Sequence, residues 1–341
     1  MNTFWTRADF QRKVVRSLAH SSSSKVSVYL HASPPADVQR QQVAGRWQGL
    51  RQQLAELGAE KSDLALIDDA VSNFACGDRM LAVLVSDGQV WLSAELDHSD
   101  EPDRAVIGQW PRIVPLIRWG QRQLPAVVAL VGHGDAEVSV YNAGTRVSTE
   151  IVPGPDDEIE RNAPGGWSQG RYRRRAEDSW AHNAVTFAQR IAQIAQATDA
   201  KLIVLSGDVR EVHLVLDRLP ADLREIVSTV PGPKSDDHRT AQIAARDLRS
   251  LSEETARKWR RAVVAGFDDS SGRSLAVEGP VAVQQALERG AVRQLLIVDG
   301  VPSDQSVDAM ACVALDTDAE IVVLEPDEIT LVGGIGASLR F

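Results

Sequence analysis

The sequence predicts a mixed α/β (α+β) protein of three domains. The chain has 341 residues, of which 43% are hydrophobic and 25% are charged, a balance typical of globular proteins. Short runs of β-forming residues alternate with longer stretches of helical period, as in layered α/β domains. We expect an N-terminal α/β domain over 1–122, a central mixed-sheet domain over 123–267 and a small C-terminal α/β sandwich over 268–341.

The N-terminal domain is expected to start with a helix, a strand and a longer helical stretch. A helical pattern covers Arg7–Leu18, and the alternating run Val26–Leu30 predicts a strand. The polar, Gln- and Leu-rich stretch Asp37–Phe74 predicts one or two amphipathic helices, with Gly58 as a break.

A hairpin and a connection are expected to complete this domain. The apolar runs Met80–Leu84 and Val90–Ala94 are separated by Ser-Asp-Gly-Gln, which is a hairpin signal. Pro111–Leu124 has prolines at its start and interior and is followed by another. We interpret it as a connecting segment.

The central domain is expected to begin with an antiparallel meander. Apolar runs at Val127–Val131, Val138–Tyr141 and Arg146–Val152 predict three strands, with Gly132–Asp135 (G-H-G-D) as the first turn. A phosphate-binding loop is the weaker interpretation of that turn, because no helix follows it.

A long helix is expected from Arg171 to about Thr198, where proline and glycine are absent. Its apolar residues recur at three- and four-residue spacing, which predicts one buried stripe. The stripe consists of Trp180, Ala184, Phe187, Ala188, Ile191 and Ala195. His182 and Asn183 lie on the same helix, as bracing residues or as RNA contacts.

A strand at Lys201–Leu205 is expected next, followed by a helix near Val209–Arg218 with Asp208 as its N-cap. A further helical region covers His238–Val264.

The C-terminal domain repeats the alternation of helix and strand. Glu278–Arg289 predicts a helix that ends at Gly290, and Ser306–Leu315 predicts a shorter helix. Leu295–Val298 and Glu320–Leu324 predict strands. The run Gly333–Gly336 is interpreted as a turn.

Charge and cysteine content restrict the function classes. A net charge of −10 and a pI near 5.3 argue against a protein wrapped by nucleic acid, and we expect no DNA partner. Two distant cysteines, Cys76 and Cys312, favour a reducing cytoplasm. Neither a signal peptide nor a membrane span is expected, nor a metal or other cofactor.

The strongest functional signal is the segment Pro164–Arg175, P-G-G-W-S-Q-G-R-Y-R-R-R. Its glycines permit a close backbone approach to a partner, and its arginines suit phosphate groups. Trp167 and Tyr172 offer surfaces on which bases can stack. A loop over 162–172 that leads into a basic helix therefore fits a narrow RNA-lined channel. The alternative is a surface loop followed by a solvated helix face.

This segment resembles the Gly-Gly-Gln loop of the archaeal and eukaryotic class-1 release factors, which leads into an arginine-rich helix. The residues with counterparts in that pattern are Gly165, Gly166, Arg171, Arg174, Glu177, His182 and Asn183. The stretch Ala276–Gly300 resembles the third domain of the same family. The resemblance covers about Ala126–Phe341, and the N-terminal part shows no decoding motif such as N-I-K-S.

Within the superfamily the chain resembles bacterial members, namely the Balon-like hibernation factors and the Vms1-like peptidyl-tRNA hydrolases. The hydrolases carry G-x-x-Q in this loop, as does Gly166-Trp167-Ser168-Gln169. The loop departs from Gly-Gly-Gln by two inserted residues. Two outcomes stay open: Gln169 positions a water against the peptidyl-tRNA ester, or Trp167 plugs the site without hydrolysis.

The resemblance implies a cytoplasmic factor that binds the 70S ribosome, through ribosomal RNA at the A site and near the peptidyl-transferase centre. It also implies elongation factor Tu as a partner. Gln169 is the candidate catalytic residue. The candidate RNA-binding residues are Gly165, Gly166, Trp167, Ser168, Gly170, Arg171, Tyr172, Arg173, Arg174 and Arg175. A small-molecule enzyme with a mobile lid is a third hypothesis, although no cluster of acids or bases accompanies the loop.

Overall fold

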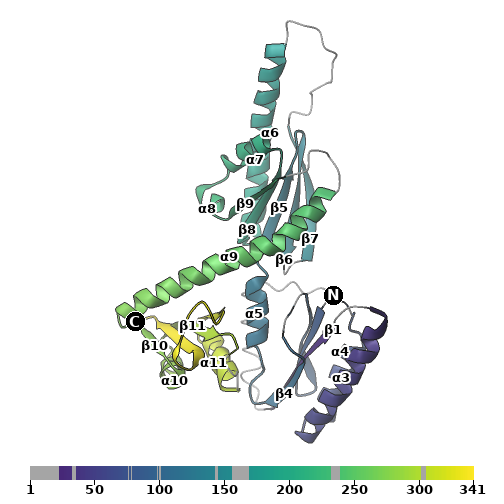
Figure 1. The fold of residues 1–341 in the computed structure, drawn as a ribbon, viewed down its shortest axis with the longest axis vertical. Helices are drawn as coiled ribbons and strands as arrows, with labels where there is room; N and C mark the ends of the chain where they lie inside the picture. The colour runs from purple at the N-terminus through teal and green to yellow at the C-terminus, as the bar shows by residue number, and fades with distance from the viewer. Residues whose placement is uncertain are drawn as a thin grey trace. The chain divides into compact units, whose positions relative to one another are not determined.

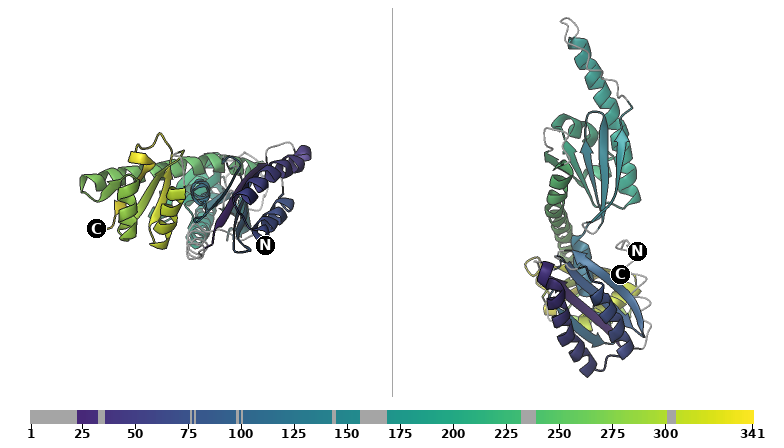
Figure 2. Two further views of the ribbon diagram at one scale, coloured as in Figure 1. Left: turned by 90° about the horizontal axis from the view of Figure 1, so that it is seen from below. Right: turned by 90° about the vertical axis from the view of Figure 1, so that its right-hand side faces the viewer.

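The protein is built from two compact units, one of which interrupts the other in sequence. The computed structural model describes residues 23–32, 36–75, 77, 79–97, 99, 101–142, 145–155, 169–231, 239–300 and 305–341. Unit 1 contains Met1–Gln121 and Lys258–Phe341, and unit 2 contains Arg122–Arg257. Each unit has its own β-sheets, as the ribbon views show (Figures 1 and 2). The predicted division into three domains stays a prediction.

The first sheet of unit 1 is antiparallel and has the strand order β3-β2-β1-β4. Its strands are β1 (Lys25–Ala32), β2 (Arg79–Ser86), β3 (Gln89–Asp97) and β4 (Arg104–Gly108). Helices α3 (Ala36–Glu56) and α4 (Lys61–Ser72) cover one face. The predicted hairpin is confirmed, with Asp87 and Gly88 at φ 56° and 65°, as a type I′ turn requires.

Alternation along β1 and β2 divides this sheet between two cores. Val28 and Val83 point to the α3–α4 side, whereas Tyr29 and Ala82 belong to a second cluster on the opposite face. Both faces are therefore buried, which explains why β1 and β2 are almost continuously apolar.

The second sheet of unit 1 has the order β10-β13-β11-β12, with β11 and β12 parallel. Its strands are β10 (Ala276–Glu278), β11 (Val292–Val298), β12 (Glu320–Leu324) and β13 (Ile335–Leu339). Helices α10 (Pro280–Glu288) and α11 (Gln305–Asp316) pack on one face. The last turns of α9 (Arg239–Gly272), including Phe267, pack on the other. The predicted small α/β sandwich is confirmed.

Helix α5 (Val114–Arg122) occupies most of the predicted connecting segment Pro111–Leu124, for which no helix was predicted. Pro115 is compatible with a helix because it lies in the first turn, where its missing N–H has no intrahelical partner to lose. Val114, Leu116, Ile117 and Gln121 are buried on this helix.

Buried polar contacts join α5 to the C-terminal sheet of unit 1. The carboxylate of Asp308 on α11 accepts hydrogen bonds from the backbone N–H groups of Ile113 (2.9 Å) and Val114 (3.1 Å). The Gln121 side chain donates to the Ile321 carbonyl and accepts from the Val323 N–H, so it pairs with the β12 backbone. The two ends of the chain therefore share one core.

Unit 2 is a mixed five-stranded sheet with the order β7-β6-β5-β8-β9. Its strands are β5 (Ala126–Val131), β6 (Asp135–Asn142), β7 (Thr145–Pro153), β8 (Leu202–Gly207) and β9 (Val227–Pro231). The predicted meander β5–β6–β7 is antiparallel, and β8 and β9 continue in parallel. Helices α6 (Gln169–Ala197), α7 (Val209–Leu216), α8 (Ala221–Arg224) and the first part of α9 complete the unit.

Most of the other predicted elements are confirmed. The break at Gly58 separates α3 from α4, where Gly58 has φ 92°. Asp208 caps α7 and accepts a hydrogen bond from the Arg210 N–H. Strands β4, β9, β10 and β13 were not predicted, and Gly336 of the predicted turn lies in β13. The predicted helix at Arg7–Leu18 lies outside the described residues. Within the described part of the chain, no helix combines the length and apolar character needed to cross a bilayer.

Gly207, at the end of β8, provides a test of the β5–β8 pairing. It has φ 149°, and a Cβ there would lie 2.2 Å from the Val131 carbonyl oxygen. We expect Gly207→Ala to lower the free energy of unfolding by about 1–3 kcal/mol, measured by urea denaturation. In the control Gly266→Ala, the new Cβ on α9 meets no atom within 4 Å. That variant should be neutral or gain up to about 1 kcal/mol. Equal losses in both variants would contradict the steric argument.

Candidate nucleic-acid interface

Helix α6 begins directly at the predicted functional segment. It starts at Gln169, two residues before the predicted start. The candidate residues Gln169, Gly170 and 171–175 therefore lie on its first two turns, and the side chains of α6 are described from Trp180 onward. Gly165, Gly166, Trp167 and Ser168 lie outside the described residues.

The backbone of α6 fixes how the arginine positions are arranged. At 3.6 residues per turn, positions 171, 174 and 175 share one face of the helix, and position 173 lies on another. Positive charge is therefore distributed around the start of α6 rather than confined to one stripe.

The other end of α6 is anchored on the sheet by its predicted apolar stripe. Ala184, Phe187, Ala188, Ile191 and Ala195 are all buried in one cluster with β5, β6, β8 and α7. Small alanines alternate with large side chains, which lets the helix lie close to the sheet. Full burial of each large apolar side chain contributes about 1.5–3 kcal/mol, so this contact holds α6 firmly.

Above the stripe, a polar junction connects α6 to the β5–β6 turn and to α7. The His133 imidazole Nδ1 contacts the Glu211 carboxylate of α7. The His133 ring also packs against Trp180 of α6, with ring centroids 4.9 Å apart and an angle of 54° between planes. Glu211 is 5% exposed, whereas His133 is 63% exposed, so the ring shields the carboxylate from solvent.

Asn183 ties α6 to the same turn. Its side-chain N–H donates to the His133 carbonyl at 3.0 Å, and the residue is 1% exposed. Gly154, just after β7, leaves the space for it, since a Cβ there would lie 2.5 Å from the Asn183 Cγ. Asn183 is therefore a bracing residue, one of the two roles considered for it, whereas His182 is exposed.

Burial raises the pKa of Glu211 to about 7, and the charge of Asp208 adds to this rise. The contact with His133 acts in the opposite direction. An unfolded chain would release this proton near the ordinary glutamate pKa of 4.5. Between pH 4.5 and about pH 7, Glu211 is therefore more protonated in the folded protein than in the unfolded chain.

The sequence analysis did not identify this junction as a unit. It assigned Gly132–Asp135 correctly to a hairpin turn between β5 and β6. It placed Trp180 in the buried stripe, whereas Trp180 is half-buried, lies outside that cluster and packs against His133. The signal that could have revealed the junction is a histidine in the turn after one strand, β5, and a glutamate on the helix after the parallel neighbour of that strand, β8. The parallel pairing of β5 and β8 brings both to the same edge of the sheet.

Comparison with known proteins finds a family for the central part of the chain. Residues 125–273 match the family model of bacterial archaeo-eukaryotic release factor family 2. Over these residues the chain is similar to the bacterial branch of the archaeo-eukaryotic release-factor superfamily. The matched residues include the sheet of unit 2, the Pro164–Arg175 segment, α6 and the whole of α9. The superfamily expected from the loop and its flanking helix is thereby confirmed.

Two curated relatives come from Mycobacterium tuberculosis, the uncharacterized proteins MT2704 (strain CDC 1551 / Oshkosh) and Rv2629 (strain ATCC 25618 / H37Rv). Each is 27% identical over 289 residues, which are 82% of this chain and 76% of the relative. The similarity to these relatives therefore extends well beyond the region that the family model covers.

Solved structures with a similar fold include Saccharomyces cerevisiae Dom34, described as a translation termination-like factor involved in RNA quality control pathways and interacting with Hbs1. It is 14% identical, with a TM-score of 0.46 over 77% of this chain and 80% of that one. Archaeoglobus fulgidus Pelota is 15% identical, with a TM-score of 0.39 over 78% and 80%.

The raised pKa of Glu211 predicts a pH-dependent stability. Between about pH 5 and pH 8 the unfolded chain loses the Glu211 proton before the folded chain does, so the free energy of unfolding falls as pH rises. Glu211→Gln should make the pH dependence flatter in denaturation series across this range. The control Glu225→Gln changes an exposed glutamate of the same unit and should follow the wild type. An unchanged slope in Glu211→Gln would contradict the assignment.

Proposed function

We propose that this protein is a ribosome-associated translation factor that binds the ribosomal A site through Gly165–Arg175 and does not catalyse a reaction there. Its role would be in ribosome hibernation or stress. The observation that carries the proposal is the family match over 125–273, which includes this segment together with the sheet and helix that support it.

The distribution of charge supports a local contact with RNA. The protein as a whole carries −10, which keeps nonspecific attraction to nucleic acid weak. The arginines at 171, 173, 174 and 175 lie at the start of α6, where they would neutralise phosphates at one place. Binding would therefore depend on a channel that fits the tip of unit 2.

The anchoring of α6 supports a tip that projects. Gln169 precedes the bracing residue Asn183 by fourteen residues of continuous helix. At 1.5 Å per residue this is roughly 21 Å along the helix axis. The candidate residues would thus be presented at a distance from the packed sheet, on a support held by the stripe and the polar junction.

The loop sequence favours binding over hydrolysis. Release-factor chemistry depends on positioning, and a displacement of about 1 Å can reduce a rate about 100-fold. This loop carries two extra residues between Gly166 and Gln169, and one of them is Trp167. A tryptophan of this size would fill a pocket rather than position a water. Elongation factor Tu is the proposed partner for delivery, on the basis of the resemblance to hibernation factors.

Removal of the arginines at the start of α6 tests the interface. We expect the triple variant Arg171→Gln, Arg174→Gln, Arg175→Gln to bind 70S ribosomes roughly 1000-fold more weakly or worse, because each charge-assisted contact contributes about 1.5–3 kcal/mol and each 1.4 kcal/mol is tenfold in affinity. Co-sedimentation at near-physiological salt, with and without elongation factor Tu, measures this. The salt dependence should also fall, by about one unit of slope per lost phosphate contact.

The control is a charge-matched triple variant of exposed arginines elsewhere: Arg257→Gln, Arg261→Gln and Arg289→Gln. It should bind as the wild type does. Equal weakening in both variants would mean that total charge, not the tip, governs binding. Failure of the wild type to sediment with ribosomes under either condition would overturn the proposed function.

Peptidyl-tRNA hydrolysis is the second candidate, favoured by the G-x-x-Q match at Gly166–Gln169. Under the main proposal, the wild type releases no labelled peptide from ribosome-bound peptidyl-tRNA. Release that is lost in Gln169→Ala, with ribosome binding unchanged, would replace the main proposal with the hydrolase. Release that persists in Gln169→Ala would exclude Gln169 as the residue responsible.

A further inference from the structure

The packing of Trp180 on His133 is the described contact of α6 that lies nearest to the functional segment. Trp180 is the first described side chain of the helix, and the buried stripe starts one turn later at Ala184. The Trp180 Nε1 is buried and forms no hydrogen bond among the described residues, so packing on the imidazole is what holds the indole. A displacement of that ring would therefore release the first described part of α6.

The position of the His133 ring depends in turn on Glu211. The ring is exposed, and its Nδ1 contacts the buried Glu211 carboxylate. Within the described part of the chain, Glu211 forms an ion pair with His133 alone. An exposed ring has few neighbours, so its contacts with α7 and with Trp180 set its position. The β5–β6 turn, α6 and α7 are thus connected through one imidazole.

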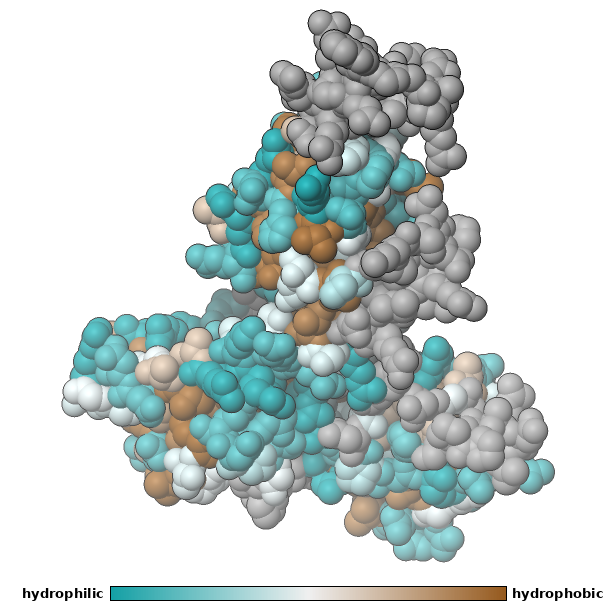
Figure 3. Space-filling model, turned by 45° about the horizontal axis from the view of Figure 1, so that its top comes forward, coloured by the Kyte–Doolittle hydropathy of each residue, from teal (hydrophilic) through white to brown (hydrophobic). Residues whose placement is uncertain are grey.

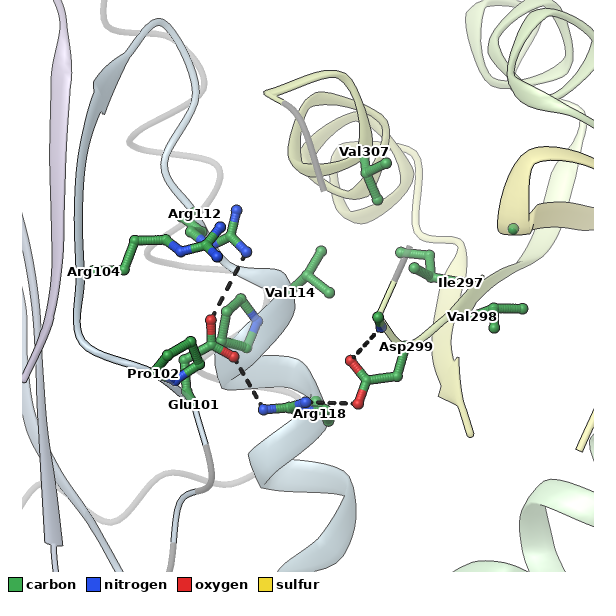
Figure 4. Close-up of a pocket in the computed structure, with 13 residues that line it drawn as sticks. Glu101, Pro102, Arg104, Arg112, Val114, Arg118, Ile297, Val298, Asp299 and Val307 are labelled. Carbon is green, nitrogen blue, oxygen red and sulfur yellow. Dashed lines mark hydrogen bonds and ion pairs between the residues drawn. The ribbon is translucent and has the colours of Figure 1, made fainter. Parts of the chain in front are cut away.

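Part-buried acids of unit 1 have arginine partners instead. The Arg118 guanidinium lies 3.0 Å from Glu101 and 2.6 Å from Asp299 (Figure 4). Arg260 lies 2.8 Å from Glu328. A guanidinium keeps its proton at every physiological pH, whereas an imidazole can gain or lose one between pH 6 and pH 8. The imidazole–carboxylate pair of unit 2 therefore responds to pH in a range where these arginine pairs do not.

The elements packed around Glu211 bring few other titratable groups. Among its charged neighbours, His133 has the largest effect on the Glu211 pKa, and Asp208 at the start of α7 follows. Strands β8 and β9, which pack on α7, contain no titratable side chain. The β5–β6 turn and the described part of α6 bring three further charged or titratable groups: Asp135, His182 and Arg190. Arg190 is paired with Glu150 of β7. His133 is therefore the partner with which Glu211 shares a proton.

We propose that the proton shared by His133 and Glu211 controls how firmly the start of α6 is held, and through it how well the functional segment binds. With this proton the pair carries no net charge, and the ring stays against Trp180. Without it, a buried carboxylate lies beside a neutral imidazole, which is unfavourable unless water reaches the carboxylate. Hydration of Glu211 requires the ring to move, and the start of α6 then loses its contact. The effect on binding rests on the proposed function, whereas the effect on α6 does not.

Amide hydrogen exchange of the full chain tests the effect on α6. Opening of the junction releases the Glu211 proton, because the pKa falls from about 7 toward the ordinary value of 4.5. The protection factors of residues 169–180 in the wild type should therefore fall about 10-fold between pH 6 and pH 8. Glu211→Gln keeps the shape of the protonated carboxyl and should show no such fall. The control Glu225→Gln changes an exposed glutamate of the same unit and should follow the wild type.

A second variant tests the ring itself. His133→Ala removes the contact with Trp180 and should lower the protection of residues 169–180 already at pH 6, where the wild type is well protected. The control His213→Ala removes an exposed histidine of α7 and should leave this protection unchanged. Wild-type protection in His133→Ala, or a wild-type pH dependence in Glu211→Gln, would overturn the proposal whatever the ribosome experiments give.

Co-sedimentation with 70S ribosomes at pH 6 and pH 8 tests the link to binding. The affinity of the wild type, relative to that of Glu211→Gln at the same pH, should fall by up to about 10-fold between the two conditions. Equal affinities of both proteins at both pH values would overturn the effect on binding, even if the exchange data are as expected. Absence of ribosome binding at both pH values would overturn the proposed function alone, because the exchange data do not depend on ribosomes.

Discussion

The packing of α6 on the β5–β6–β8 face is the contact on which the candidate interface depends. Helix α6 begins at the functional segment, and the side chains that pack it on the sheet lie from Ala184 onward. The packing of this later part sets the direction of the helix. The stripe around Phe187 and Ile191 supplies this fixation through apolar burial, and Asn183 adds a specific hydrogen bond to the His133 carbonyl. The packed part of α6 thus supports the functional segment at the start of the helix.

Unit 1 depends on a different kind of contact, in which polar side chains bridge segments far apart in sequence. Asp308 accepts two backbone N–H groups at the start of α5, and Gln121 pairs with the backbone of β12 on both of its polar atoms. Each side chain replaces hydrogen bonds that a regular element would otherwise make. A buried polar group without a partner costs about 1–3 kcal/mol. A shift of α5 along the sheet would break these pairs, so they fix the position of α5 along the sheet as well as its distance from it. On the face that Figure 3 shows, hydrophobic residues lie in patches among hydrophilic ones.

The sequence was informative wherever a local period or a specific turn determines the structure. The hairpin at Asp87–Gly88, the break at Gly58 and the N-cap Asp208 could all be predicted, because each depends on neighbouring residues alone. Helix α5 could not, because its prolines masked a pattern that burial between two sheets stabilises. Strand β13 contains two small residues and a glycine, and only its pairing with β10 and β11 makes it a strand. The junction of His133, Trp180 and Glu211 needed the parallel register of β5 and β8, which spacing along the chain does not reveal.

The division of unit 1 into two sequence segments has a consequence for how the protein folds during its synthesis. Tyr29 and Ala337 lie in the same core, yet roughly 220 residues separate Gln121 from the end of β13, the strand that contains Ala337. At about 5–20 residues per second, a translating ribosome takes roughly 10–45 s to make them. Unit 2 is continuous and can fold during that interval. Meanwhile the α5-facing side of the first sheet has no partner, and its apolar surface is a site for a chaperone or for misassociation with a neighbouring nascent chain. Unit 1 therefore completes its fold only after the whole of unit 2 has been synthesised.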